Sequence, residues 1–144
     1  MAATDGSSDR FFEAMLQEQT LEQLEACVWL HDDFGSHVVQ QSQRLRKVPI
    51  GQLGVEDLRL LITQGIGLPF LVPLALDLLE AQPLVEGAYY RGDLLVSVLQ
   101  VGEAFWVAYP ELNNRVVELM EELRQLHDLL VSEVLPVASR FQYR

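Results

Sequence analysis

The stretch that decides the fold is LGVEDLRLLITQGIGLPFLVPLALDLLEAQPLVEGAYYRGDLLVSVL, residues 53–99. It contains three apolar segments separated by glycine and proline. The second and third segments are apolar on nearly every face, and a helix without a polar face has to be buried on all sides. The rest of the chain is therefore expected to pack around this stretch.

Glycine marks both ends of the first apolar segment. Gly54 is followed by Glu56 and Asp57, and acids in a first helical turn complement the positive end of the helix dipole. Gly65 suits the left-handed conformation that follows many helix ends. A helix is therefore predicted between the two glycines. Its buried face is predicted to consist of Val55, Leu58, Leu61 and Ile62.

Proline sets the start of the second apolar segment. Inside a helix, Pro73 would lose a hydrogen bond to the carbonyl of residue 69, and its ring would clash with that carbonyl. The regular helix is therefore predicted to begin near Val72, with Pro73 in its first turn, and to end at residues 82–83. Asp77 and Glu80 lie three residues apart, so they share one exposed stripe of this helix.

The third apolar segment and the C-terminal part are also expected to be helical. Asp93 is a plausible N-cap for a helix over residues 94–101, although the valine content leaves a strand open. A short helix is predicted over residues 103–109. A long amphipathic helix is predicted over residues 110–131, with Pro136 ending the helical region.

The N-terminal part carries weaker signals. Residues 1–9 are small and polar and are expected to fray. Thr20 followed by Gln23 is typical of a capping box, which marks a helix start. Cys27 then falls in an apolar helical run, where a thiol is usually buried.

The only basic cluster is RLRK, residues 44–47, within a helix predicted over residues 36–48 and capped by Asp33 or Ser36. It has no interleaved aromatic residues and lies in an acidic chain, so nucleic-acid binding is not expected. The cluster is expected to pair internally with the acidic surface. Together the segments predict an all-α fold, a single compact globule of about six or seven helices in one domain, residues 1–144.

The composition narrows the class of protein. The chain has 21 acids and 10 bases, a net charge of −11 that both halves share. Such a charge repels nucleic-acid phosphates and anionic lipid and attracts basic partners. A single cysteine excludes an intrachain disulfide, and the N-terminus has no signal-peptide pattern. A cytoplasmic protein without membrane or nucleic-acid partners is expected, and plain solubility remains an alternative reason for the charge.

No residue pattern predicts catalysis, a cofactor or a metal. The three histidines lack an acid partner motif, and residues 65–67 follow no strand and carry no Lys-Ser/Thr of a phosphate loop. Metal-ligand types gather at His31, Asp32, Asp33 and His37. Phe34 and Gly35 interrupt them, and the spacing matches no structural zinc motif. The protein is therefore expected not to be an enzyme.

Residues 33–99 resemble the immunity proteins of bacterial contact-dependent growth inhibition (CDI) systems. The blocks that carry the resemblance are LRKVPI at 45–50, GVEDLRLLITQGIGLPFLVPLAL at 54–76, PLVEG at 83–87 and YYRGDLLVSVL at 89–99. Ser42 departs from the family pattern, which has a cysteine there, and this difference concerns packing. The residues flanking residues 33–99 match only in general character.

The resemblance implies a cytoplasmic protein that neutralises the C-terminal toxin domain of a large secreted effector. Such toxins are often nucleases with basic clefts, which an acidic helical module would suit. We expect the chain to occlude the toxin's active site and to be monomeric when free. The candidate contact residues are Asp32, Asp33, Asp77, Glu80, Glu86, Tyr89 and Tyr90.

Alternatives remain at this point. The acidic residues are also explained as a solvated face, and the rings of Tyr89 and Tyr90 as caps of the core. A small helical enzyme, an unrelated acidic adaptor or a self-assembling structural protein would account for the same composition. An enzyme predicts a deep pocket with perturbed titratable groups, whereas self-assembly predicts a large exposed apolar patch.

Overall fold

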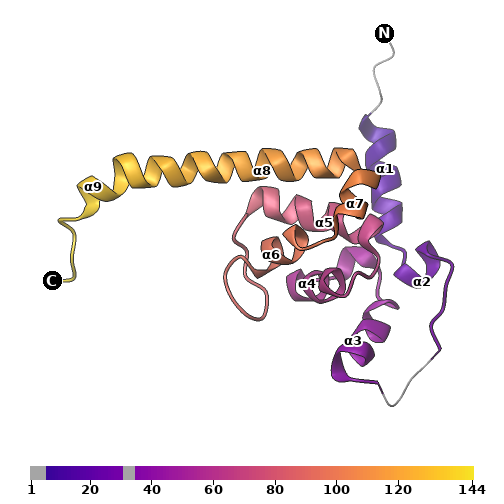
Figure 1. Cartoon of the computed structure of the whole chain (residues 1–144). Helices are drawn as coiled ribbons and strands as arrows, with labels where there is room; N and C mark the ends of the chain where they lie inside the picture. The colour runs from indigo at the N-terminus through magenta and orange to yellow at the C-terminus, as the bar shows by residue number, and fades with distance from the viewer. Residues whose placement is uncertain (1–5, 31–34) are drawn as a thin grey trace, which may run out of the picture. The chain divides into compact units, whose positions relative to one another are not determined.

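The computed structural model describes residues 6–30 and 35–144, and the regular elements within them are all helical (Figure 1). The predicted all-α class is therefore confirmed. The chain divides into two compact units, residues 1–102 and residues 103–144, and each is described by itself. None of the helices in the described ranges has the length and apolar character that crossing a membrane requires.

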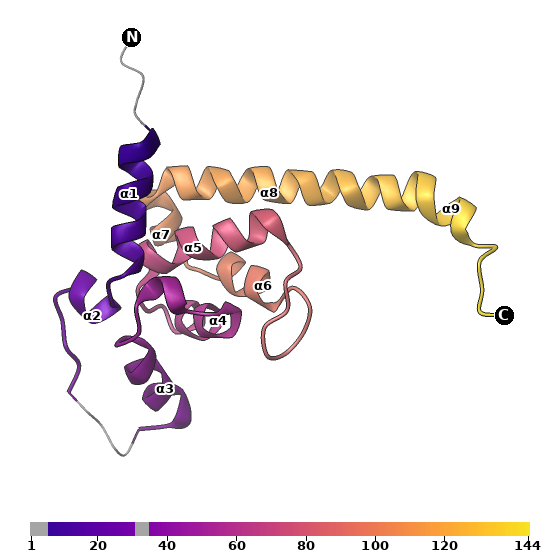
Figure 2. The same cartoon turned by 180° about the vertical axis from the view of Figure 1, so that it is seen from behind.

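Three helices form the centre of the first unit: α4 (Val55–Thr63), α5 (Leu68–Ala81) and α6 (Asp93–Leu99). Each contacts the other two, and the two opposite views show them side by side (Figures 1 and 2). The side chains that they bury together are Leu58, Leu61, Ile62, Leu71, Val72, Ala75, Leu76, Leu79, Leu94, Leu95 and Val98. Residues 53–99 thus supply most of the core, as their apolar segments predict.

Helix α5 begins earlier than predicted and contains Pro73 in its interior. Gly67 precedes it in the left-handed conformation (φ 64°), and its carbonyl accepts the N–H of Leu71 at 2.9 Å. The expected start near Val72 was therefore wrong. Proline removes one helical hydrogen bond, and the buried side chains on both sides of Pro73 outweigh that loss, because burying one large apolar side chain contributes about 1.5–3 kcal/mol.

The N-terminal elements are α1 (Gly6–Gln17), α2 (Leu21–Leu24) and a 3₁₀ turn (Ile50–Gln52). Helix α1 includes residues 6–9, the end of the segment that was expected to fray. The capping box at Thr20 is confirmed: its hydroxyl accepts the N–H of Gln23 at 3.2 Å, and the Gln23 side chain accepts the N–H of Thr20 at 2.9 Å.

Cys27 is exposed, so the expectation of a buried thiol within a helix was wrong. Helix α2 ends because Ala26 adopts the left-handed conformation (φ 50°). The N–H of Cys27 then donates to the carbonyl of Glu22 at 3.1 Å, which closes the helix in the manner of a Schellman motif. The apolar run that follows is therefore not helical.

Helix α3 (His37–Leu45) has Ser36 as its N-cap, as predicted, but ends before residue 48. Arg46 follows it and is fully buried. Its Nη2 donates to the Cys27 carbonyl at 3.0 Å and to Glu25 Oε1 at 3.3 Å, and its guanidinium lies 4.3 Å from the centre of the Trp29 ring. The predicted internal pairing of the basic cluster is thus confirmed at Arg46.

The second unit contains α7 (Glu103–Ala108), α8 (Pro110–Leu129), a π-helical turn (Leu130–Val134) and α9 (Leu135–Ala138). The ring of Phe105 packs on those of Trp106 and Tyr109, with centroids 5.1 and 4.9 Å apart. Pro136 does not end the helical region, contrary to expectation. The π-helical turn changes the hydrogen-bond register just before it, so Pro136 falls in a new first turn, where its missing N–H costs little.

Candidate partner-binding site

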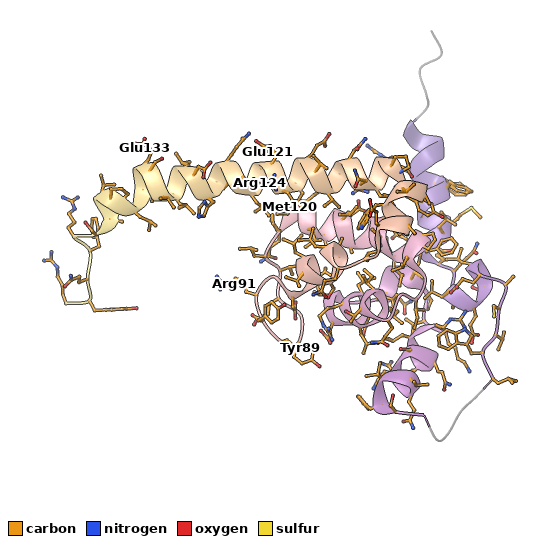
Figure 3. All side chains as sticks on the ribbon, in the orientation of Figure 1. Tyr89, Arg91, Met120, Glu121, Arg124 and Glu133 are labelled. Carbon is orange, nitrogen blue, oxygen red and sulfur yellow. The ribbon has the colours of Figure 1, made fainter. Side chains whose placement is uncertain are left out.

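The loop of residues 82–92 connects α5 to α6 and carries three of the predicted contact residues. Glu86 and Arg91 face each other in an isolated β-bridge, and the N–H of Gly92 donates to the carbonyl of Val85 at 3.3 Å. Gly92 has a φ of 93°, a conformation that favours glycine. In Figure 3 Tyr89 and Arg91 point to different sides of this loop.

The carboxylate of Asp93 holds the loop from inside. Asp93 is buried in the first turn of α6, and Gly92 is the N-cap, so the prediction of Asp93 as N-cap was wrong. Its Oδ1 accepts the N–H of Gly87 at 2.7 Å, while Oδ2 accepts those of Tyr89 at 3.1 Å and Tyr90 at 3.4 Å. A carboxylate with three such donors fixes the loop backbone more firmly than one turn hydrogen bond would.

Helix α4 supplies a second anchor to the same loop. Glu56 Oε2 accepts the N–H of Ala88 at 2.8 Å. The carboxylate of Glu56 also accepts two hydrogen bonds from Arg59, from Nε to Oε2 at 2.7 Å and from Nη2 to Oε1 at 2.6 Å. This bidentate pair fixes the orientation of Glu56 toward the loop.

Arg59 also supports the aromatic tip of the loop. Its guanidinium carbon lies 4.5 Å from the centre of the Tyr89 ring, a cation–π distance. The side chain of Arg59 is only 14% exposed, whereas Tyr89 is 71% exposed and Tyr90 51%. The two rings therefore belong to the surface, and the alternative that they cap the core is excluded.

Gly87 allows the two anchors to approach the same backbone. A Cβ atom at this position would lie 2.8 Å from Glu56 Oε2 and 2.9 Å from Asp93 Oδ2, closer than real Cβ contacts. Both oxygens are held in hydrogen bonds, so neither can simply move aside. Glycine is required here for space.

The pKa shifts in this network keep its groups charged. The hydrogen bonds from Arg59 lower the pKa of Glu56, and those from Glu56 raise the pKa of Arg59. Burial raises the pKa of Asp93, but the backbone N–H groups of the loop outweigh this effect, and the net shift is downward. All three shifts lead away from neutral pH, so Glu56, Arg59 and Asp93 remain charged there.

A pocket of about 340 Å³ lies beside the network. Glu56, Arg59 and Tyr89 form part of its wall, and the rest comes from α3, α4 and the residue that follows α4. The remaining lining residues are His37, Val38, Leu60, Thr63 and Gln64. Because the loop contributes Tyr89 to the wall, the loop conformation affects the shape of this pocket.

The structure separates the predicted contact residues into groups. Glu86, Tyr89 and Tyr90 lie together in the loop of residues 82–92. Asp77 and Glu80 are both exposed on α5, on the stripe that their spacing predicts. Asp32 and Asp33 lie outside the described residues. Among the residues that the structure describes, no group of three or more His, Cys, Asp or Glu side chains is placed to hold a metal ion.

Glu56, Arg59 and Asp93 are the residues of this site that the sequence interpretation missed. A Glu and an Arg three residues apart at a helix start are a common surface pair, and nothing local marks them as loop anchors. The available signal was the aspartate that directly follows a loop bounded by glycines. Such a residue is as well placed to bind the preceding loop as to cap its own helix.

A family model of CDI immunity proteins matches residues 23–116. The chain belongs to this family. The match covers more than half of the chain and includes α3 to α7 and the loop of residues 82–92. The resemblance seen in the sequence blocks is thereby confirmed, and membership implies a toxin-neutralising role. Searches of curated proteins and of solved structures found no match.

Proposed function

We propose that this CDI immunity protein binds the toxin domain at the C-terminus of its cognate effector and blocks that domain's active site. The observation that carries the proposal is the pair of exposed rings, Tyr89 and Tyr90, on a loop that two carboxylates hold. Tyrosine provides apolar contact area and a polar group at small cost in side-chain entropy. A fixed loop of this kind is suited to a protein partner.

The charge of the chain supports a basic partner. A nuclease toxin has to bind phosphates and therefore presents a positive cleft, and a protein with a net charge of −11 is attracted to it. Asp77, Glu80 and Glu86 are exposed and supply negative charge on α5 and the loop. We therefore propose a nuclease as the toxin, and Asp32 and Asp33 as further contacts.

The direct test is co-expression of this chain with the toxin domain of the neighbouring effector, followed by co-purification and a growth-rescue assay. Binding together with rescue is expected. A toxin that stays lethal and does not co-purify would refute the proposal. Cell fractionation, with the chain expected in the cytoplasm, tests the proposed location.

Charge reversal tests the α5 stripe. Asp77→Lys with Glu80→Lys is expected to weaken toxin binding without steepening its salt dependence. The reason is that removing attractive charges leaves fewer charge–charge attractions between the two proteins for salt to screen. The matched control is Glu121→Lys with Glu122→Lys on α8. Unchanged affinity of the α5 variant would show that this stripe lies outside the interface.

A second candidate rests on the exposed apolar side chains near the C-terminus. Between residues 126 and 137 these are Leu126, Leu129, Leu130, Val131, Val134, Leu135 and Val137. A helix with such a surface is a candidate for self-association. We propose a monomer for the free chain in one domain, and sedimentation equilibrium distinguishes the two: a concentration-dependent dimer would favour self-association.

A further inference from the structure

The loop of residues 82–92 combines exposed rings with an internally fixed backbone. Its N–H groups at residues 87–90 donate to two carboxylates that come from different helices, Asp93 on α6 and Glu56 on α4. A surface loop that only links two helices does not need such a set of anchors. The anchors restrict the conformations of the residues that carry Tyr89 and Tyr90.

Part of the same network also lines the pocket beside the loop. Arg59 binds Glu56 through two hydrogen bonds and supports the Tyr89 ring at 4.5 Å. Glu56, Arg59 and Tyr89 all line the pocket of about 340 Å³. One network therefore fixes both the projecting rings and the hollow next to them.

We infer that Glu56, Arg59 and Asp93 are positioning residues that hold the Tyr89–Tyr90 loop and its pocket in the shape that the toxin domain recognises. This inference rests on the proposed function and names the part of the surface that carries it. A loop ordered before binding loses less conformational entropy on association, so the network raises affinity without touching the toxin.

The internal pairing of charges defines the kind of contact that this site makes. Glu56 and Arg59 cancel each other, and Asp93 is buried and already accepts several hydrogen bonds. The site therefore recognises a protein surface by shape, ring contacts and hydrogen bonds, whereas long-range attraction comes from the net charge of the whole chain. Arg59→Lys, which disturbs the network without changing the net charge, is expected to change the dissociation rate and to leave the salt dependence of binding unchanged.

Three variants of the full chain test the inference by titration with the toxin domain. Asp93→Asn replaces one acceptor oxygen by an NH₂ group that faces N–H donors. Arg59→Lys keeps the charge but loses the bidentate geometry. Glu56→Gln removes the negative charge that accepts the two hydrogen bonds from Arg59. Each is expected to lower the affinity by roughly tenfold to a hundredfold, the range of a hydrogen bond to a charged group.

The chain offers a matched control for Arg59→Lys. Arg124 and Glu121 form a pair with the same three-residue spacing on α8, at 3.8 Å, but both side chains are mostly exposed. Arg124→Lys is expected to leave the affinity unchanged. An equal loss in Arg59→Lys and Arg124→Lys would overturn the inference.

A double-mutant cycle separates positioning from a general effect on folding. If Asp93 acts through the loop, its effect on toxin affinity depends on the two rings. In a chain that already carries Tyr89→Ala and Tyr90→Ala, Asp93→Asn should therefore lower the affinity only slightly further. The combined variant is then expected to bind about as weakly as the weaker of its parents. Additive losses would overturn the inference.

Hydrogen exchange gives an independent readout. The N–H groups of residues 87–90 are expected to exchange faster in Asp93→Asn, while those of α5 remain protected. If Asp93→Asn does not fold, hydrogen exchange of the loop and toxin affinity are measured on Glu56→Gln instead, and they test the inference in the same way. Failure of the wild-type chain to bind the toxin would refute the proposed function, whereas wild-type binding with undiminished binding by the variants would refute only the inference.

Discussion

Asp93 Oδ1 lies 2.7 Å from the amide nitrogen of Gly87, six residues earlier in the chain, and this bond joins the start of α6 to the loop that precedes it. A carboxylate in a first helical turn usually binds the N–H groups of its own helix. Here it reaches back to the loop, and Glu56 of α4 approaches the same segment from the other side. Gly87 provides the space for both.

Gly87→Ala is expected to destabilise the protein by about 1–3 kcal/mol, the usual cost of forcing extra volume into a packed site. The added methyl group would lie 2.8 Å from Glu56 Oε2. Urea unfolding followed by circular dichroism measures the loss. Gly102→Ala is the control, because a Cβ there meets nothing within 4 Å. Equal stabilities of the two variants would contradict the close packing at Gly87.

Gly67→Ala is expected to cost more stability than Gly65→Ala. Both glycines have left-handed backbone conformations, with φ values of 64° and 71°, so alanine at either position loses about 1–2 kcal/mol. At Gly67 the new Cβ would also lie 2.7 Å from Cδ2 of the buried Leu21, whereas at Gly65 it meets nothing within 4 Å. Thermal melts of the two variants give the comparison. Identical melting temperatures would show that Leu21 adjusts freely.

Arg46→Ala is expected to lower the free energy of unfolding by about 2–3 kcal/mol, since it removes a buried side chain together with its hydrogen bonds. The lost contacts are those with Glu25, the Cys27 carbonyl and the Trp29 ring. Arg44→Ala changes an exposed arginine in the preceding helix and serves as the control. Guanidinium unfolding monitored by tryptophan fluorescence tests the difference, and similar midpoints for the two variants would speak against an anchoring role of Arg46.

The loop network is expected to lose its contribution to stability in acid. Folding lowers the pKa of Glu56 below its ordinary value of 4.5 and that of Asp93 below 3.8. The unfolded chain therefore binds more protons in this range, and the contribution is present above the ordinary values and lost as the pH falls through the lower pKa values of the folded state. The stability difference between wild type and Glu56→Gln is expected to shrink as the pH is lowered. A constant difference would contradict the assigned shifts.

Local patterns of the sequence were sufficient for much of the fold. The acids after Gly54, the capping box at Thr20 and the left-handed glycine at Gly65 each act within a few residues, so the chain itself specifies them. Pro73 was interpreted wrongly because a local rule was applied where tertiary burial prevails. Cys27 was interpreted wrongly because Ala26, a residue that rarely adopts a positive φ, ends α2.

The sequence by itself determined the all-α class, the central position of residues 53–99, the exposed stripe of Asp77 and Glu80, and the family. These features follow from periodicity, from glycine and proline at fixed points and from recognisable blocks. Only the tertiary structure decided that Glu56 of α4 and Asp93 of α6 bind one loop, since the two residues are far apart in the chain. Hydrogen bonds between distant segments depend on how the helices pack, and that packing leaves no local pattern in the sequence.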